Sequence, residues 1–212
     1  MEIKSFVFNP FYENTYLLWS DTKEAIIVDP GCYERYEIEE IVSFIKDHEL
    51  KIQAIVNTHC HIDHVLGNAH LKDYFNCPLW IPKGELDVLR SVAVYAPQWG
   101  IQKYTEAIPE KLLEETDIIT FGGTSLSSIL VPGHSPGHLM YLHEPSETLI
   151  GGDVLFKGSI GRTDLPGGNH QQLLDNIKNK VYILPNDTVV YPGHGPETTI
   201  GEEKRTNPFI KG

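Results

Sequence analysis

The pattern of hydrophobic and polar positions alternates between short apolar runs and amphipathic stretches. Short apolar runs bounded by turn-forming residues are typical of β-strands. The first third of the chain contains four, namely SFVF, TYLLWS, EAIIVD and IQAIVNT. Before the fourth run, apolar residues recur at helical spacing among charged ones. They predict an amphipathic helix packed on a sheet, through Ile38, Ile41, Val42 and Ile45. GNAHLKDYF predicts a short helix after the fourth run.

The second half of the chain repeats this alternation. Its predicted strands are TSLSSILVPGH, HLMYLHE, TLIGGDVLF and DTVVYPGHG. Another helix is predicted through Leu173, Leu174, Ile177 and Val181. Strands and helices alternate in both halves, which favours an α/β sandwich with helices outside two mixed sheets. The 212 residues suit a single domain, 1–212.

The segment at about residues 82–116 is less regular and reads as a helical and loop insertion. It is rich in aromatic residues, which include Tyr95, Trp99 and Tyr104. Aromatic residues at this density are expected to pack in a core or in a subunit contact. The alternative is a lid that walls a functional cleft.

Composition and charge narrow the classes of partner. A formal net charge of −12 argues against long nucleic acid, because phosphate backbones need a basic surface. No apolar run approaches the length that spans a bilayer, and MEIKSFVFNP has no signal-peptide core. The three cysteines are scattered, without a Cys-x-x-Cys pair. We therefore expect a cytoplasmic protein in a reducing compartment, without membrane or nucleic-acid partners.

The densest chemistry lies in THCHIDHV, residues 58–65. His59 and His61 are two apart, so both point the same way in an extended segment and both can reach one ion. Asp63 and His64 are adjacent and can turn toward a second ion. A histidine-rich surface loop is the alternative interpretation. It is disfavoured because three further polar residues follow apolar strands in the same manner, namely His134, Asp153 and His194. Nitrogen and oxygen ligands without a cysteine suit zinc, iron or manganese.

These motifs carry a family resemblance. THCHIDH, PGHSPGH, GGDVLF and YPGHG resemble, in order, the signature of the metallo-β-lactamase superfamily, and Asp29 resembles its leading aspartate. The chain is most similar to the hydroxyacylglutathione hydrolase (glyoxalase II) branch, whose C-terminal end the tail TTIGEEKRTNPF resembles. GSIGRTDLPGG resembles the short single-domain members of that branch and, in part, the persulfide dioxygenases.

The resemblance implies an αββα sandwich and two divalent metal ions per chain. We expect zinc, with iron or manganese as alternatives. One ion would be held by His59, His61 and His134. The other would be held by Asp63, His64 and His194. Asp153 would bridge the two, so Asp63 and Asp153 are the expected catalytic carboxylates.

Several neighbours of these residues receive other roles. Cys60 lies between two expected ligands and should point away from them into the core. Asp29 is expected to orient a ligand imidazole through its second nitrogen. His138 is expected to be structural or to contact a ligand, and His143 to be solvated. Arg162 follows Asp153 in a Gly-rich loop.

Arg162 has two interpretations. It forms a structural salt bridge with Asp164, or it contacts the substrate. Full-length glyoxalase II has a helical C-terminal domain that helps to hold glutathione, and this chain lacks the length for one. Lys and Tyr residues of the family after the bridging aspartate are also replaced, by Arg162 and Asp164.

Two such ions would supply a bridging hydroxide that attacks an electrophilic carbonyl. A thiolate, with a pKa near about 8.5, departs without a strong general acid, which favours thioesters over amides. We therefore expect a small-molecule thioester substrate derived from glutathione. One rival is a mononuclear iron persulfide dioxygenase that uses His59, His134 and Asp153. An RNA-processing nuclease and a non-catalytic scaffold are less favoured rivals.

Overall fold

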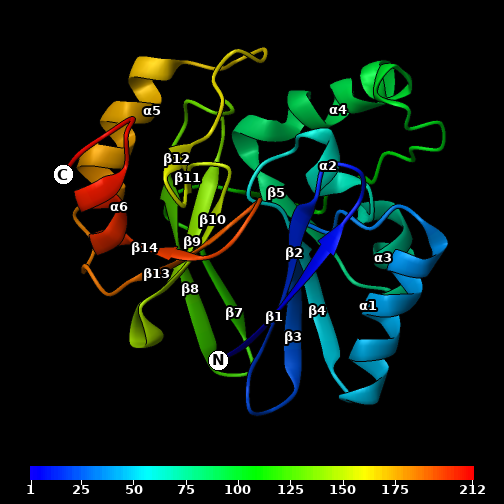
Figure 1. Cartoon of the computed structure of the whole chain (residues 1–212). Coiled ribbons are helices and arrows are strands. Elements are labelled where there is room, and N and C mark those ends of the chain that lie inside the picture. The colour runs from blue at the N-terminus through cyan, green and yellow to red at the C-terminus, as the bar shows by residue number, and fades with distance from the viewer. The chain divides into compact units, whose positions relative to one another are not determined.

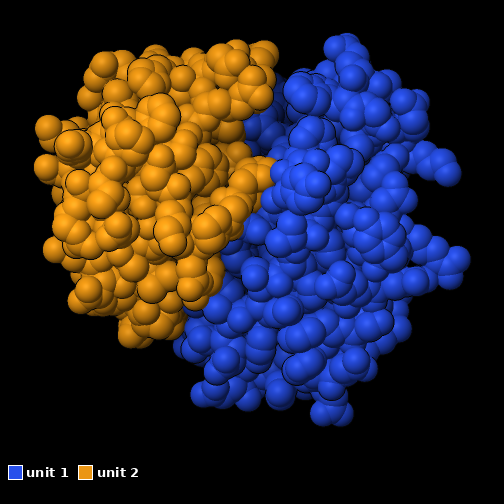
Figure 2. Space-filling view, viewed as in Figure 1, with its two compact units in different colours: residues 1–113, 120–124 blue, residues 114–119, 125–212 orange.

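The computed structural model describes residues 1–212, which divide into two compact units (Figure 2). Unit 1 comprises residues 1–113 and 120–124, and unit 2 comprises residues 114–119 and 125–212. Each unit is centred on a mixed six-stranded sheet (Figure 1). The single domain over 1–212 stays a prediction.

The sheet of unit 1 has the strand order β1-β2-β3-β4-β5-β6. Its strands are β1 (Glu2–Phe8), β2 (Glu13–Trp19), β3 (Glu24–Val28), β4 (Lys51–Val56), β5 (Leu79–Pro82) and β6 (Lys111–Leu113). β2 pairs antiparallel with both β1 and β3. The pairs β3–β4, β4–β5 and β5–β6 are parallel. The carboxyl ends of β3 and β4 therefore meet at one edge of the sheet.

Helices α1 and α3 lie along this sheet (Figure 1). The helices of unit 1 are α1 (Arg35–Asp47), α2 (Ile62–Val65), α3 (Asn68–Phe75), η1 (Lys83–Glu85), α4 (Leu86–Tyr95) and η2 (Ala96–Trp99). A capping box begins α1, because the buried Glu37 carboxylate accepts the backbone N–H of Glu34 at 2.9 Å. The predicted apolar face of α1 is confirmed, with Ile41, Val42 and Ile45 buried in the core. Each such side chain contributes about 1.5–3 kcal/mol when buried.

The insertion at 82–116 contributes η1, α4, η2 and β6 to unit 1. Tyr95 and Tyr104 pack against the buried core, as the core-packing interpretation predicted. Trp99 is 51% exposed, and its ring meets that of Phe11 edge-on at 5.8 Å.

The sheet of unit 2 has the order β14-β13-β10-β9-β8-β7. Its strands are β7 (Ile118–Phe121), β8 (Thr124–Leu130), β9 (Leu139–His143), β10 (Thr148–Gly152), β13 (Val189–Pro192) and β14 (Thr198–Thr199). Strands β10 and β13 are parallel, so their carboxyl ends also meet at one edge. A register shift between Ile150 and Gly152 bends β10 just before Asp153.

A hairpin and the remaining helices complete unit 2. A small hairpin pairs β11 (Leu155–Phe156) with β12 (Ser159–Ile160). The remaining helices are η3 (Glu144–Ser146), α5 (His170–Asn176), its π-helical continuation η4 (Ile177–Val181), and α6 (Ile200–Thr206). Leu173, Ile177 and Val181 are fully buried, which confirms the predicted helix. None of the helices in the chain has the length and apolar character needed to cross a membrane.

Candidate metal-binding site

Unit 1 carries four of the predicted ligands directly after β4. His59 and His61 lie in extended chain, and their rings are perpendicular at 4.8 Å. Asp63 and His64 lie on the single turn of α2, which begins after His61. Oδ2 of Asp63 and Nε2 of His64 are 3.6 Å apart. The chain thus changes from extended to helical between the two pairs, as the spacing of the motif suggested.

That separation of 3.6 Å fits a shared cation. It is too long for a hydrogen bond. Two ligand atoms at about 2.1 Å from one tetrahedral ion lie about 3.4 Å from each other. The donor set of unit 1 therefore fits a metal ion in both chemistry and spacing.

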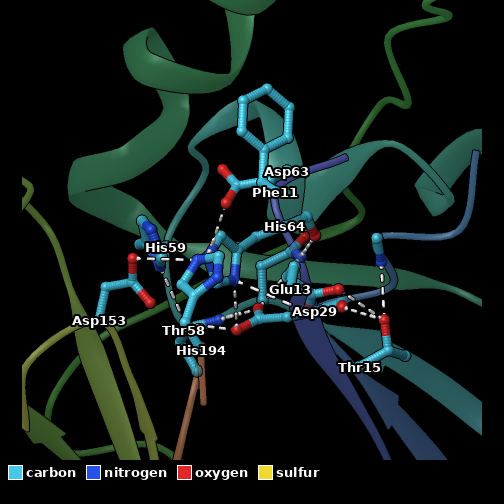
Figure 3. Close-up of polar contacts among 12 residues, drawn as sticks. Phe11, Glu13, Thr15, Asp29, Thr58, His59, Asp63, His64, Asp153 and His194 are labelled. Carbon is cyan, nitrogen blue, oxygen red and sulfur yellow. Dashed lines mark hydrogen bonds and ion pairs between the residues drawn. The ribbon is translucent and has the colours of Figure 1, made fainter. Parts of the chain in front are cut away.

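Asp29 accepts hydrogen bonds from both Thr58 and His64 (Figure 3). Its Oδ2 accepts the Thr58 hydroxyl at 2.6 Å and Nδ1 of His64 at 3.2 Å. Its Oδ1 accepts the Thr58 backbone N–H at 2.6 Å. Because a carboxylate only accepts, the His64 proton sits on Nδ1 and the lone pair on Nε2. The predicted contact of Asp29 with an imidazole is confirmed for His64, whose role as a ligand stays a prediction.

Asp29 also reaches a second imidazole through Thr58. The Thr58 hydroxyl gives its proton to Asp29 and therefore accepts Nδ1–H of His59, at 3.1 Å. Both rings thus present Nε2 as the ligand atom. One aspartate fixes the tautomers of two predicted ligands.

The backbone of the ligand loop is held by buried side chains. Asn57 donates to the carbonyl of His64 and Asn9 to that of Asp63, each at 2.9 Å. Glu85, which is 0% exposed, accepts the backbone N–H of Cys60 at 2.9 Å. These contacts pin the loop from three separate segments of the chain.

Glu13 is a buried acid that the sequence did not single out. It is 0% exposed at the start of β2, with Oε1 3.9 Å from Nδ1 of His64. Burial raises the pKa of its carboxyl well above the usual range, and the neighbouring Asp29 raises it further. Gly31 makes room for it, because a Cβ there would lie 2.1 Å from Oε2 of Glu13. The signal in the sequence was an acid opening an otherwise apolar strand, ENTYLLW.

Unit 2 brings the other three predicted ligands together. Asp153 follows β10, His194 follows β13, and His134 follows β8. Oδ2 of Asp153 lies 3.6 Å from Nε2 of His134 and 3.5 Å from Nε2 of His194. These separations match those of Asp63 and His64 in unit 1. The donor set of unit 2 therefore also fits a metal ion.

Backbone groups orient these ligands. Nδ1 of His134 donates to the carbonyl of Arg162 at 2.8 Å, which leaves Nε2 as the ligand atom. The backbone N–H of Asp153 donates to Nε2 of His138 at 3.0 Å, which gives that histidine the expected structural role. A Cβ at Gly161 would lie 1.9 Å from the Asp153 carbonyl, so only glycine fits there.

The side chain of Arg162 is engaged by Asp164. Nε and Nη2 donate to the two carboxylate oxygens at 2.7 and 2.8 Å. This pairing lowers the pKa of Asp164 to about 2. The predicted salt bridge is confirmed, and a substrate contact of Arg162 stays a prediction.

Two other sequence predictions have clear outcomes. Cys60 is 0% exposed in the core, and burial raises the pKa of its thiol well above the usual range. This confirms its predicted burial. The predicted solvation of His143 is wrong. It is 8% exposed, and its Nδ1 lies 2.6 Å from Oγ of Ser146 in the turn that follows.

The sequence matches the metallo-beta-lactamase superfamily over residues 8–194. Hydroxyacylglutathione hydrolase GloC of Haemophilus influenzae is 34% identical over 213 residues, which cover 99% of this chain and 98% of that protein. The crystal structure of BLEG-1 B3 metallo-beta-lactamase has a TM-score of 0.89 at 38% identity and covers 100% of both chains. The crystal structure of TTHA1623 in a di-iron-bound form has a TM-score of 0.88 at 34% identity, covering 98% of this chain and 100% of that one.

These likenesses extend over the whole length of the chain. They confirm the predicted fold class, with two mixed six-stranded sheets and their helices in the metallo-β-lactamase fold. They also agree with the two His/Asp ligand sets, whose atoms fit metal ions. The chain belongs to the metallo-β-lactamase superfamily and is a metal-dependent hydrolase of that superfamily.

Proposed function

We propose that the protein is a thioester hydrolase of the hydroxyacylglutathione hydrolase type. The observation that carries this proposal is the likeness to GloC along 99% of the chain. Donor atoms spaced for metal ions in both units support it. The substrate would be a small thioester derived from glutathione.

The proposed centre holds two divalent ions, assigned by the match of each motif to the superfamily signature. His59, His61 and His134 would hold the first ion. Asp63, His64 and His194 would hold the second, and Asp153 would contribute to both. The di-iron form of TTHA1623 supports two ions in a relative of this length. We expect zinc, with iron or manganese as alternatives, because the donors are nitrogen and oxygen.

The two ions, when bound, supply hydroxide at neutral pH and offset the charge that develops on the carbonyl oxygen. The chain's own residues keep the donor atoms ready. Asp29 and the Arg162 carbonyl hold the protons of His64 and His134 on Nδ1. Asp63 and Asp153 act as ligands and are not available to protonate a leaving group. A thiolate needs no such acid, because its conjugate acid has a pKa near about 8.5.

Arg162 is the proposed contact for a substrate carboxylate. Its side chain is 54% exposed, but its guanidinium must give up the ion pair with Asp164 in order to bind the substrate. Losing a charged hydrogen bond costs about 1.5–3 kcal/mol, roughly ten- to a hundredfold in binding. Arg162→Ala should therefore raise KM for glutathione thioesters more than for an uncharged thioester. Asp164→Asn, which releases the guanidinium, should lower it.

β-Lactam hydrolysis is the second candidate. The likeness to BLEG-1 B3 metallo-beta-lactamase, at 38% identity over the full chain, favours it. The leaving group in β-lactam hydrolysis is an amine nitrogen rather than a thiolate, so this reaction is faster when a proton donor is present. That requirement places it behind thioester hydrolysis.

One experiment separates the candidates. Protein loaded with zinc, iron or manganese is assayed with S-D-lactoylglutathione, a chromogenic cephalosporin and glutathione persulfide, and its metal content is measured. We expect the highest kcat/KM on the thioester, with two ions per chain. Faster turnover of the cephalosporin would overturn the proposal in favour of a β-lactamase. Oxygen-dependent persulfide turnover with one iron would overturn it in favour of the dioxygenase.

A further inference from the structure

The C-terminal helix α6 buries a carboxylate that the proposed chemistry does not use. Glu203 is 0% exposed and forms no salt bridge. Its Oε1 accepts the hydroxyl of Thr198 at 2.5 Å. Its Oε2 accepts the backbone N–H of Gly158 at 3.0 Å and Nδ2 of Asn207 at 2.8 Å. A buried carboxyl group is costly unless hydrogen bonds satisfy it, and here the donors come from several segments of unit 2.

Asn207 extends the same network. It is 0% exposed, and its Nδ2 also donates to the carbonyl of Ser159 at 3.0 Å. Gly158 lies in the turn of the β11–β12 hairpin with a φ of 69°, and Ser159 is the first residue of β12. Glu203 of α6 and Asn207 just after it therefore hold the turn and the start of β12 by their backbone atoms.

The hairpin leads directly to the predicted ligands of unit 2. β11 begins two residues after Asp153. After β12, the N–H of Gly161 donates to the carbonyl of Val154 at 3.1 Å, and the Arg162 carbonyl accepts Nδ1 of His134 at 2.8 Å. The same hairpin carries Phe156, the last residue of β11.

The ring of Phe156 meets that of His194 at 6.3 Å and 72°, edge to face. The hairpin therefore adjoins Asp153, hydrogen-bonds His134 through its continuation, and packs against His194. A shift at its turn would be transmitted to all three predicted ligands.

We propose that Glu203 is a positioning residue for metal binding by unit 2. Its carboxylate, with the Asn207 amide, fixes the turn of the β11–β12 hairpin, and the hairpin fixes the ring of His134 and the backbone of Asp153. This inference rests on the proposed ligand roles of His134 and Asp153. A residue that only stabilised the fold would leave the hydrogen bond of His134 unchanged in the folded protein.

The test compares three variants. Glu203→Ala removes the acceptor. Glu203→Gln keeps an oxygen for the Gly158 N–H and the Asn207 amide, and offers its own amide to the Thr198 hydroxyl. Glu202→Ala is the matched control, because Glu202 is the exposed neighbour that pairs with Arg205. Hydrogen exchange of His134 Nδ1–H and of the Gly158 amide is followed by NMR in the metal-free protein. Zinc affinity is measured by competition with a chelator.

Glu203→Ala should lower zinc affinity by about ten- to a hundredfold, the usual cost of losing a group that orients a metal ligand. Exchange of His134 Nδ1–H should accelerate about tenfold, as expected for the loss of about one hydrogen bond. Glu203→Gln should restore both, and Glu202→Ala should change neither. In Glu203→Ala, kcat should fall while KM changes little.

A folded Glu203→Ala protein with a lower Tm, but with wild-type His134 exchange and zinc affinity, would overturn the inference. Should this variant fail to fold, Asn207→Ala tests the same link through Ser159, with the same expected and contrary results. The exchange measurements need neither metal nor substrate. If wild-type protein bound none of zinc, iron and manganese, the proposed function would fail, while exchange would still decide whether Glu203 positions His134.

Discussion

The two units orient the imidazoles of their predicted ligands by different hydrogen bonds. In unit 1, a buried carboxylate holds the imidazole of His64 directly and that of His59 through Thr58. In unit 2, a backbone carbonyl holds His134. Both units use the carboxyl ends of neighbouring parallel strands: Asp29 follows β3 and four predicted ligands follow β4, whereas Asp153 follows β10 and His194 follows β13. The scaffolds are alike, whereas the supports behind the ligands differ in charge.

This difference has a chemical consequence. A hydrogen bond to a carboxylate is stronger than one to a neutral carbonyl, and it makes the imidazole a better donor to a metal. Unit 1 therefore depends on the charge of Asp29, which a single substitution removes. In unit 2, the orientation of His134 depends on the position of the Arg162 carbonyl, and a side-chain substitution alters a backbone carbonyl only indirectly. Burial does not follow this division, because His134 of unit 2 is 2% exposed and is thus about as buried as His59 and His64 of unit 1.

The largest effect is expected from Asp153→Ala in unit 2. Its carboxylate is the one that both imidazoles of this unit approach. A metal ion contributes several kcal/mol to such a reaction, so losing the centre should lower kcat/KM at least about a thousandfold. Elemental analysis should show fewer than two ions per chain. The control is Asp187→Ala, which removes an exposed carboxylate of the same unit. An Asp153→Ala protein with two ions and normal activity would refute the ligand assignment.

The next effect is expected from Asp29→Asn in unit 1. The substitution keeps the shape of the side chain but removes the charge that Nδ1 of His64 and the Thr58 hydroxyl face. Metal affinity should fall about ten- to a hundredfold. A chelator competition measures it, with Asp21→Asn on an exposed turn as the control. Unchanged affinity would show that charge is not what distinguishes unit 1 from unit 2.

A smaller effect is expected from Glu85→Ala, which removes a support of the unit 1 loop backbone. It leaves the buried N–H of Cys60 without its acceptor. An unsatisfied buried donor costs about 1–3 kcal/mol in the free energy of unfolding. Urea unfolding measures the loss, and Glu85→Gln should restore most of it. Glu106→Ala, in an exposed part of the same insertion, is the control. A loss no larger than that of the control would remove Glu85 from the supports of unit 1.

How far the sequence predicted the site follows from the same comparison. The seven candidate ligands and Asp29 stood out in the sequence because they follow apolar runs, singly or as the THCHIDH cluster, where polar side chains have a chemical meaning. The ligand roles stay a prediction. The Arg162 carbonyl left no signal, because every residue type has one. Glu13, Glu85 and Glu203 were not recognised, because the sequence does not distinguish a buried glutamate from an exposed one before the tertiary contacts are known.

The fold shows a similar limit. The longer strands and α1 were predicted from their periodicity. β11, β12 and β14 have two residues each, too few to show any period. His143 was expected in water because histidine is often exposed, but the turn at Ser146 buries it. Local pattern predicts the elements, whereas burial of a polar residue depends on contacts that only the fold creates.

The smallest effect is a dependence of stability on pH that unit 1 should show through Glu13. Burial raises the folded-state pKa of this carboxyl above its unfolded value, which is about 4.3. Between the two values the native state holds a proton that the unfolded state has lost. The free energy of unfolding therefore falls as pH rises, by at most about 1.4 kcal/mol per pH unit. The contribution is complete below the unfolded pKa and lost once pH passes the folded pKa.

Urea unfolding of metal-free protein tests this, with Glu13→Gln as the reference that cannot titrate. The stability of the wild type relative to Glu13→Gln should decrease from about pH 4.3 upward and level off above the folded pKa. Titrating groups that lie far from Glu13 cancel in the difference, because they are common to both proteins, whereas its charged neighbours His64 and Asp29 do not. A positive charge on His64 opposes the rise in the pKa of Glu13, because Nδ1 of His64 lies 3.9 Å from Oε1 of Glu13. A difference that stays constant or rises with pH would mean that Glu13 is ionised when folded, which would make the support of unit 1 doubly anionic.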